Sequence, residues 1–305
     1  MGCQPQASGR YPPADTSGVS PFTGSIERLL LPIGPTFVEL GIRIVEPASA
    51  PAATIFCIHD FDGNGLDFVS LARHFGERGC RVVLPDMPGR GSSAALPPGV
   101  PSLLGQVAAL RAVFSHYPSH QTVVVACGWG AAIALAALAA AVPGLRGFVA
   151  TDLPLDYSVN GDPLIGHVRA NSARVFESEA AACRAVLQSP AFAASGLSEA
   201  DVSHRVKRDD TGFRFNYDDH IGEAAGHFST ARFDLPDAMR RLPCPILLMS
   251  AQTVDGPTND RLSLLQREAI NLRYVEVDTP GNRILLNHVD RWVVEEFVAT
   301  LIESA

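Results

Sequence analysis

The residues best placed to do chemistry lie in a turn between a buried strand and a helix. Residues 122–127 (TVVVAC) are apolar and β-branched, as in a buried strand, and residues 130–140 are Ala-rich and read as a helix. The turn between them, residues 126–130 (ACGWG), has the form small-x-nucleophile-x-small, in which the central side chain attacks a substrate. That central position has positive φ, which glycine adopts at little cost, but Gly128 offers no attacking atom. We expect the turn to be kept and its nucleophile to be missing.

Cys127 is the other candidate nucleophile in this turn. A thiolate beside a helix N-terminus can be activated, but Cys127 precedes the apex, where its side chain turns into the packing around the sheet. Shifting the turn by one residue would put Val125 and Trp129 where small residues are needed. We therefore expect a structural cysteine, and the six cysteines lack the paired spacing of a disulfide framework or a zinc site.

The elements that must position these residues alternate between strand and helix patterns. This alternation predicts an α/β fold with a mostly parallel sheet flanked by helices, opened by an antiparallel pair of strands. Strand signals stop after about residue 156, and stretches such as 178–187 and 198–208 read as helices. We expect a flexible tail at 1–21, an α/β core at 22–155 and 235–305, and an inserted helical cap at 156–234. The expected strands are 25–32, 37–46, 53–59, 81–85, 122–127, 146–151, 245–250 and 272–277, and the expected core helices are 67–78, 102–117, 130–140, 259–269 and 289–302.

Three segments resemble the α/β-hydrolase superfamily, of the capped esterase, epoxide-hydrolase and meta-cleavage-product-hydrolase type. The first carries IHDFDGN at 58–64 and DMPGRGSS at 86–93, which are similar to the family's oxyanion loop and its DxxGxGxS turn. The second is the turn at Gly128, and the third runs from Cys244 through the last strand and helix. The resemblance covers about residues 25–155 and 240–302 and implies an α/β-hydrolase fold. A fold does not by itself imply an activity.

Carried over to this sequence, the family's catalytic triad is incomplete. The nucleophile position is Gly128, and the histidine position in the loop after the last strand holds Asn282. An amide cannot accept a proton as a general base near neutral pH. Asp255 suits the position of the acid, although a loop residue that caps the helix near Asn259 is the simpler interpretation, because a carboxylate with no imidazole to orient has no role in a triad.

The oxyanion loop departs from the family as well, because His59-Asp60 stands where the family has His-Gly. An oxyanion hole aims backbone N–H groups at developing negative charge, which the Asp60 carboxylate would oppose if it pointed there. In that orientation Asp60 could bind a cationic or hydroxyl group of a ligand. In the alternative, its side chain turns to solvent or caps the helix near Asp67. Trp129 resembles the tryptophan of the Asp-Trp-Gly elbow of epoxide hydrolases and haloalkane dehalogenases. The predicted ligand-binding residues are His59, Asp60, Phe61 and Trp129, with His59 also fitting a structural role.

The histidines give no metal site, because no pair has ligand spacing supported by a partner carboxylate. His204, His220 and His227 fall in or near the cap, where one of them could reach a pocket, and His167 is most simply a surface residue. We predict no metal and no cofactor.

Composition limits the partners. A net charge of −8 argues against nucleic acid or an anionic membrane as the main partner. No segment is long and apolar enough to span a bilayer, and residues 1–21 lack the apolar centre of a signal peptide. We therefore expect a cytoplasmic protein.

Together these features favour a degenerate α/β-hydrolase that binds a small, largely apolar ligand under the cap, or a protein partner, without ester hydrolysis. One alternative is an active enzyme of the same fold, a hydrolase or lyase, that uses Asp60, Asp62, Asp255 or a cap histidine. The other is an interaction protein that pairs with an active homologue. A homo-oligomer is compatible with each of them.

Overall fold

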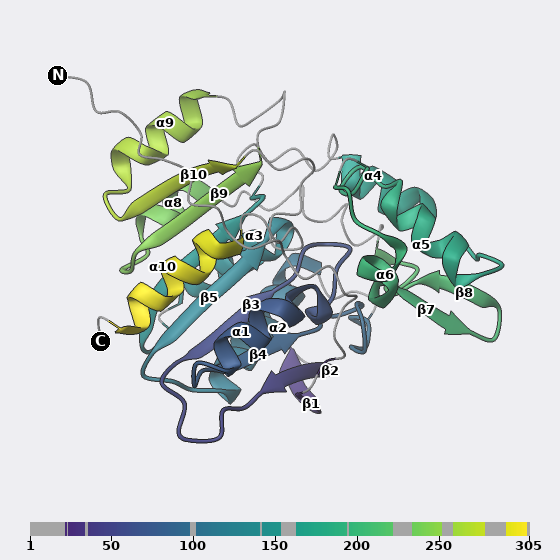
Figure 1. The fold of residues 1–305 in the computed structure, drawn as a ribbon, viewed down its shortest axis with the longest axis horizontal. Helices are drawn as coiled ribbons and strands as arrows, with labels where there is room; N and C mark the ends of the chain where they lie inside the picture. Colours follow the sequence, from purple (N-terminus) through teal and green to yellow (C-terminus); the bar gives the residue numbers. More distant parts are fainter. Residues whose placement is uncertain are drawn as a thin grey trace, which may run out of the picture.

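An eight-stranded sheet forms the centre of the molecule (Figure 1). The computed structural model describes residues 22, 24–33, 36–97, 102–140, 142–153, 163–193, 195–221, 234–251, 259–277 and 291–303. The strand order is β1-β2-β4-β3-β5-β6-β9-β10. Only the pairs β1·β2 and β2·β4 are antiparallel among these neighbours, so the mostly parallel sheet with an antiparallel opening pair is confirmed. The strands are β1 (Ser25–Ile33), β2 (Thr36–Val45), β3 (Thr54–Ile58), β4 (Arg81–Pro85), β5 (Thr122–Cys127), β6 (Leu145–Thr151), β9 (Ile246–Ala251) and β10 (Leu272–Val277).

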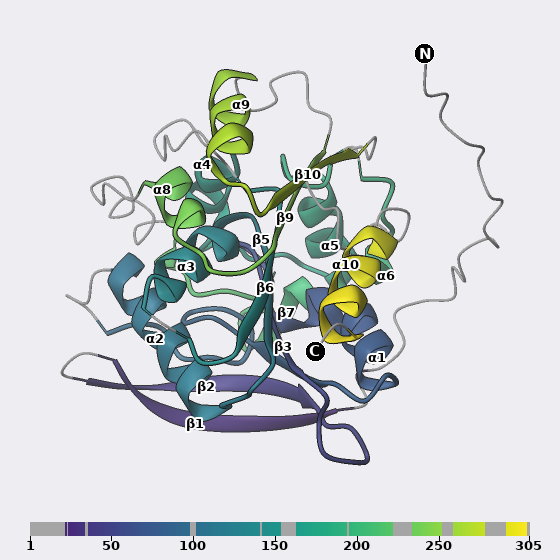
Figure 2. The ribbon, with the colours of Figure 1, turned by 90° about the vertical axis from the view of Figure 1, so that its left-hand side faces the viewer.

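Helices cover both faces of this sheet, which explains why its central strands are apolar throughout (Figure 2). On one face pack α2 (Ser102–His116), α3 (Gly128–Leu138) and α8 (Leu235–Arg240); on the other pack α1 (Val69–Gly76) and α10 (Arg291–Glu303). The helix α9 (Asn259–Glu268) precedes β10. Among the described residues, none of the helices combines the length and the apolar character needed to cross a membrane.

The helix α3 follows β5 directly and is apolar on every side, as its alanines predict. Ten of its eleven residues are buried, from Gly128 at its start to Leu138 at its end. A helix that is apolar all round must be buried on all sides. The N-terminus of α3 is therefore fixed at the carboxyl edge of β5, beside the loop that follows β3 (Figure 1).

The segment between β6 and β9 contributes a separate group of elements at one side of the sheet (Figure 1). It contains α4 (Pro163–Asn171), α5 (Glu179–Leu187), α6 (Glu199–Val202), the 3-10 helix η3 (Ser203–Arg205) and the antiparallel strands β7 (Val206–Asp209) and β8 (Gly212–Phe215). We call the described part of this segment, residues 163–193 and 195–221, the insert.

The expectation of an insert without strands is wrong, and the expected helix at 198–208 is helical only over 199–205. The chain leaves the helical conformation at Arg205 and enters β7. The reason is the turn between β7 and β8, where the Asp209 carboxylate accepts hydrogen bonds from the N–H and hydroxyl of Thr211. Gly212 then takes φ +141°, which residues with side chains avoid. This turn chemistry outweighs the helical pattern.

Candidate functional site

The turn between β5 and α3 presents Gly128 at the carboxyl edge of the sheet. Cys127 is extended, with φ −120° and ψ 137°, and Gly128 is the first residue of α3. Gly128 takes φ +53°, in the left-handed region where a side chain is strained. Gly130 must be small as well, because a Cβ there would collide with the backbone of His59. The turn therefore has the geometry expected of a nucleophile elbow, with a glycine at its apex.

The carboxylate of Asp60 occupies the space next to Gly128 that a nucleophilic side chain would fill. A Cβ atom built at Gly128 would collide with the Cγ and both carboxylate oxygens of Asp60. Asp60 follows β3 and is 6% exposed, so its carboxylate lies inside the protein. Gly128 and Asp60 therefore depend on each other: any side chain at position 128 requires Asp60 to move.

The same carboxylate is held by two backbone N–H groups. Oδ1 of Asp60 accepts the N–H of Phe61 at 2.6 Å and the N–H of Trp129 at 2.8 Å. One donor follows the apex of the elbow and the other follows β3, which is the pair that forms an oxyanion hole in folds of this kind. The alternative orientations of Asp60, toward solvent or as a cap of the helix near Asp67, are wrong. The helical turn there, η1 (Gly65–Phe68), is capped by Asn64, which accepts the N–H of Leu66.

His59 stabilises this loop through both of its ring nitrogens. Nε2 accepts the N–H of Met87 at 2.9 Å, so Nδ1 carries the proton and donates to the Asp60 carbonyl at 2.7 Å. Burial lowers the pKa of His59 to about 4, so that the ring is neutral near pH 7. The predicted ligand-binding role of His59 is therefore not favoured by this geometry.

Phe61 and Trp129, whose N–H groups bind Asp60, pack their rings against each other. Their ring centroids lie 6.2 Å apart in an edge-to-face arrangement, and both side chains are buried. The guanidinium of Arg90 lies 4.8 Å from the centroid of the Phe61 ring, and its Nε donates to the Phe61 carbonyl. These contacts fix the positions of the two N–H donors.

Cys127 lies in the apolar cluster on the α1 and α10 face of the sheet, as expected for a structural cysteine. Its thiol donates to Oδ2 of Asp152 at 3.7 Å. Asp152 follows β6 and has φ +55°, so it is strained where a residue with a side chain is uncommon. The sequence analysis did not identify Asp152, because its position at the end of β6 was its only signal.

A buried ionic network joins the insert to the core. Arg205 of η3 donates from Nη2 to Asp67 at 2.5 Å and pairs through Nη1 with Asp62 at 3.1 Å. His204 places Nε2 2.7 Å from the other oxygen of Asp67. Burial alone would raise the pKa of Asp67, but the Arg205 guanidinium and His204 hold it well below its usual range. Asp67 is therefore ionised near neutral pH.

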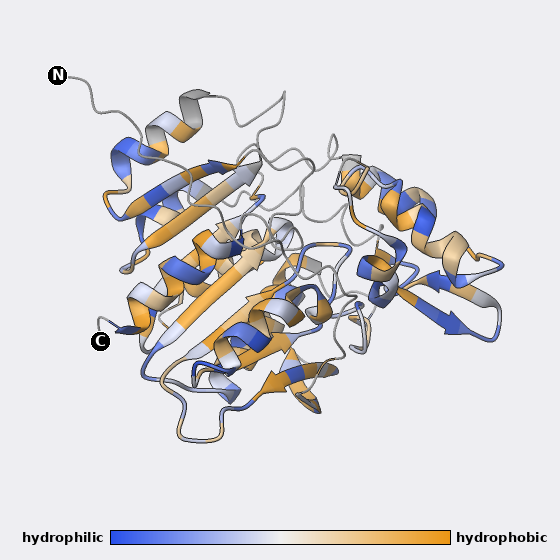
Figure 3. Cartoon of the chain, in the orientation of Figure 1, coloured by the Kyte–Doolittle hydropathy of each residue, from blue (hydrophilic) through white to orange (hydrophobic). Residues whose placement is uncertain are grey.

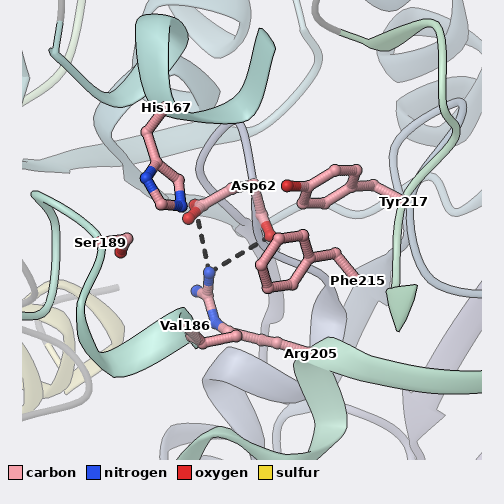
Figure 4. Close-up of a pocket in the computed structure, with 7 residues that line it drawn as sticks. All are labelled: Asp62, His167, Val186, Ser189, Arg205, Phe215 and Tyr217. Carbon is pink, nitrogen blue, oxygen red and sulfur yellow. Dashed lines mark hydrogen bonds and ion pairs between the residues drawn. The ribbon is translucent and has the colours of Figure 1, made fainter. Parts of the chain in front are cut away.

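Beside this network lies a small cavity of about 10 Å³, which is room for about one water molecule (Figure 4). Ser189 is 2% exposed, and its hydroxyl has no hydrogen-bond partner among the described residues. Burial lowers the pKa of His167, against the opposing effect of Asp62, and burial raises the pKa of Tyr217. Both side chains are therefore neutral near pH 7. The cavity is lined by Asp62 of the core and by His167, Val186, Ser189, Arg205, Phe215 and Tyr217 of the insert.

Most of these lining residues were missed from the sequence. His167 was expected at the surface, and instead it lines the cavity. Arg205, Ser189 and Tyr217 carried no spacing signal, because they come together only through the fold of the insert. None of the four predicted ligand-binding residues lines this cavity. Asp62, which follows Phe61 in the chain, does line it.

Other predicted positions lie beyond the part of the chain that the structure describes. Asp255, Asn282 and His227 fall in the segments 252–258, 278–290 and 222–233, which are not described. His204 binds Asp67, as given above, and His220 is exposed. Within the described residues there is no cluster of three or more His, Cys, Asp or Glu side chains suited to a metal ion.

Comparison with known proteins places these features in a family context. Residues 55–296 match the model of a family described as "Alpha/beta hydrolase family". A search of curated protein sequences gave no significant match.

Solved structures share the fold over nearly the whole chain. An alpha/beta hydrolase from Novosphingobium aromaticivorans has a TM-score of 0.73 and 19% identity, covering 92% of this chain and 99% of that one. E-2-(Acetamidomethylene)succinate hydrolase has a TM-score of 0.70 and 19% identity, covering 92% of this chain and 100% of that one. The thioesterase domain from the curacin biosynthetic pathway has a TM-score of 0.69 and 17% identity, covering 91% and 99%. At these identities the likeness establishes the fold alone.

Proposed function

This chain belongs to the alpha/beta hydrolase family, and on that premise we propose that it binds a small, largely apolar ligand, or a protein partner, without hydrolysing esters through an acyl-enzyme. The observation that carries the proposal is the carboxylate of Asp60, which accepts the N–H groups of Phe61 and Trp129 beside a glycine apex. The cavity between the insert and the loop after β3 marks the candidate ligand site, which has to open to admit anything larger than a water molecule.

Two steps of acyl transfer lack support at this turn. Formation of an acyl-enzyme needs a nucleophilic atom at the apex, and Gly128 has none. Stabilisation of the tetrahedral intermediate needs N–H donors aimed at its oxyanion, each of which contributes roughly 100- to 1,000-fold in kcat. Here the Asp60 carboxylate accepts both N–H groups, and its negative charge would repel an approaching oxyanion.

The test is the release of p-nitrophenol from p-nitrophenyl acetate, followed from the first turnover. We compare the wild type with the double variant Gly128→Ser/Asn282→His and with the triple variant Asp60→Gly/Gly128→Ser/Asn282→His. We expect no burst from the wild type or from the double variant, because the Asp60 carboxylate still occupies the apex space. The triple variant vacates that space. A burst from the triple variant alone would indicate that the pocket is kept and that only its catalytic groups have been lost.

A stoichiometric burst from the wild type would overturn the proposal. Slow steady turnover without a burst would instead favour the second candidate, an enzyme that uses the Asp60 carboxylate directly. Two observations keep that candidate open: Asp60 lies where the nucleophile's side chain would lie, and several similar structures are named as hydrolases. In that case Asp60→Asn, which keeps the shape of the side chain and removes its charge, should abolish the turnover.

A further inference from the structure

The strand β1 forms one outer edge of the eight-stranded sheet (Figure 2). Among the described residues its only strand partner is β2, with which it pairs without a bulge from Ser25 to Ile33. Proteins protect such an edge with short strands, bulges, lysines or prolines. This edge strand is nine residues long and contains no lysine, and its one proline, Pro32, stands next to its end. Within the described residues, the edge is therefore suited to pairing with another strand.

The contacts of β2 show which backbone groups of β1 point outward. The carbonyl of Gly41 in β2 accepts the N–H of Asp86, which follows β4 on the side away from β1. Gly41 is the register partner of Arg28, so these two residues form a pair without hydrogen bonds to each other. The N–H and C=O of Arg28 therefore point to the outer side of β1. Because such groups alternate along a strand, those of Ile26 and Leu30 point outward as well.

Three large apolar side chains lie exposed on one face of this edge. Ile26 and Leu30 of β1 and Phe37 of β2 are 58%, 66% and 63% exposed, respectively. Alternation along β1 and its register with β2 place all three on the face opposite to α2. The two strands are hydrophobic over most of their length (Figure 3). Exposed apolar groups that gather beside a strand edge mark a surface for a partner.

The charges on this face favour a second copy of the chain as that partner. The chain carries a net charge of −8, so two copies repel each other in general. On this face the exposed Arg28 and Glu39 form an ion pair of 2.7 Å, and their charges cancel. On the other face Glu27 accepts a hydrogen bond from the Tyr117 hydroxyl. Two acidic copies can therefore approach each other at this edge, and each brings the same outward backbone groups.

We propose that β1 pairs antiparallel with β1 of a second copy about a two-fold axis, so that the two sheets become one. In the favoured register Leu29 lies opposite Leu29 of the second copy, and Arg28 exchanges backbone hydrogen bonds with its Leu30. The two-fold axis repeats each contact, and the Leu30 and Ile26 side chains of the two copies lie beside each other. A shift of the register in one direction places the two Arg28 side chains opposite each other, which is unfavourable. A shift in the other direction places Pro32, which has no N–H, opposite Arg28.

The test is sedimentation equilibrium of the whole chain over a wide range of concentrations. We expect a dimer that dissociates on dilution. Ile26→Lys should weaken the dimer by at least roughly tenfold, because the symmetric interface loses an apolar contact twice and gains two charges near Arg28.

Ile270→Lys is the matched control for this variant. It makes the same chemical change at a residue that is 99% exposed and precedes β10, at the other edge of the sheet, so it should leave the association unchanged. A chain that is monomeric at every concentration would overturn the proposal. Equal effects of Ile26→Lys and Ile270→Lys on a dimer, or no effect of either, would also overturn it.

A cysteine at position 29 tests the register. Paired residues at the two-fold axis have Cα atoms about 4.5 Å apart, within the range of a disulfide. Cys3 lies outside the described residues and is replaced by serine, and the other five cysteines are buried. We expect mild oxidation to join two chains of Leu29→Cys. Ser25→Cys should not crosslink, because its two copies would lie about 27 Å apart. Crosslinking of Ser25→Cys, or of neither variant, would contradict the register.

The pairing does not rest on the proposed function. The ester assay follows chemistry at Gly128, which begins α3 after a central strand, whereas sedimentation follows an outer edge of the sheet. A burst from the wild type would overturn the proposed function and leave the pairing standing. A monomeric wild type without a burst would overturn the pairing and leave the proposed function standing.

Discussion

The substitution of glycine at the elbow apex and the presence of Asp60 belong together physically. With a side chain at position 128, the Asp60 carboxylate would have no room at the two N–H donors. Without that carboxylate, the N–H of Trp129 in the first turn of α3 and the N–H of Phe61 in the loop after β3 would both lose this acceptor, and backbone N–H groups need a partner. The negative charge of Asp60 is also favourable there because of the helix dipole. Gly128 and Asp60 are therefore one structural unit, although they are far apart in the sequence.

A double-mutant cycle tests this coupling at the level of single residues. Gly128→Ala should destabilise the wild type by about 2–5 kcal/mol, because an alanine at positive φ costs about 1–2 kcal/mol and its Cβ collides with Asp60. In an Asp60→Gly background the collision disappears, and the cost should fall to about 1–2 kcal/mol. The free energy of unfolding is measured by urea denaturation.

Gly79→Ala is the matched control for the cycle. Gly79 has φ +80°, and a Cβ there would meet no atom within 4 Å, so the substitution carries only the backbone cost. It should destabilise both backgrounds equally, by about 1–2 kcal/mol. If Gly128→Ala behaved like Gly79→Ala in the wild type, the Asp60 carboxylate would not occupy the apex space.

At the scale of elements, the core was predictable and the insert was not. The apolar run of β5 and the alanines of α3 have one physical solution, a buried strand followed by a buried helix. The DMPGRGSS turn after β4 was equally informative. Its first residue, Asp86, holds the turn by accepting hydrogen bonds from Gly65 and Ser92 and by pairing with Arg43.

The insert lacks such constraints, and the sequence therefore misled there. Its short strands β7 and β8 depend on the Asp209–Thr211 turn, whose local hydrogen bonds have no periodic signature. The cavity side chains come from α4, α5, η3, β8 and the loops beside them, so their proximity depends on packing between elements. The orientation of Asp60 was open for the same reason: its contacts with Phe61 are local, but that with Trp129 spans 69 positions.

The link between the insert and the core depends on Asp67 of η1 and Arg205 of η3. Asp67→Asn would remove one of the two carboxylates that pair with the buried Arg205 guanidinium and leave Asp62 as the other, which should cost about 1–3 kcal/mol of unfolding free energy. In contrast, Glu199→Gln breaks an ion pair with Arg184 at the surface, where the Arg184 side chain is 56% exposed and the Glu199 side chain is 45% exposed. This variant should cost less than about 1 kcal/mol. Chemical denaturation measures both. Similar losses in the two variants would show that the buried network does not hold the insert.

For the whole molecule, histidines with a lowered pKa, one buried and two half-buried, make stability depend on pH. His59, His74 and His167 all have a pKa lowered by burial. Because the pKa is lowered in the folded chain, the unfolded chain binds its proton at a higher pH than the folded chain does. The stability that the neutral histidine contributes is therefore fully present above the pKa of the unfolded chain and is lost as the pH falls through the pKa of the folded chain. Asp67 contributes in the same direction only at lower pH, because its pKa lies below the usual range of a carboxyl.

His59 should dominate this dependence, since both of its nitrogens hold the loop that carries Asp60. With its pKa lowered from 6.5 to about 4, the free energy of unfolding should fall by about 2 kcal/mol from this residue alone between about pH 7 and about pH 5. His59→Asn should be less stable near pH 7 but should lose about 2 kcal/mol less over the same interval. Urea denaturation at the two pH values, for both proteins, gives the comparison. An identical loss in the two proteins would mean that His59 is already protonated in the folded state, and the backbone contact from Met87 that fixes its tautomer would then be wrong.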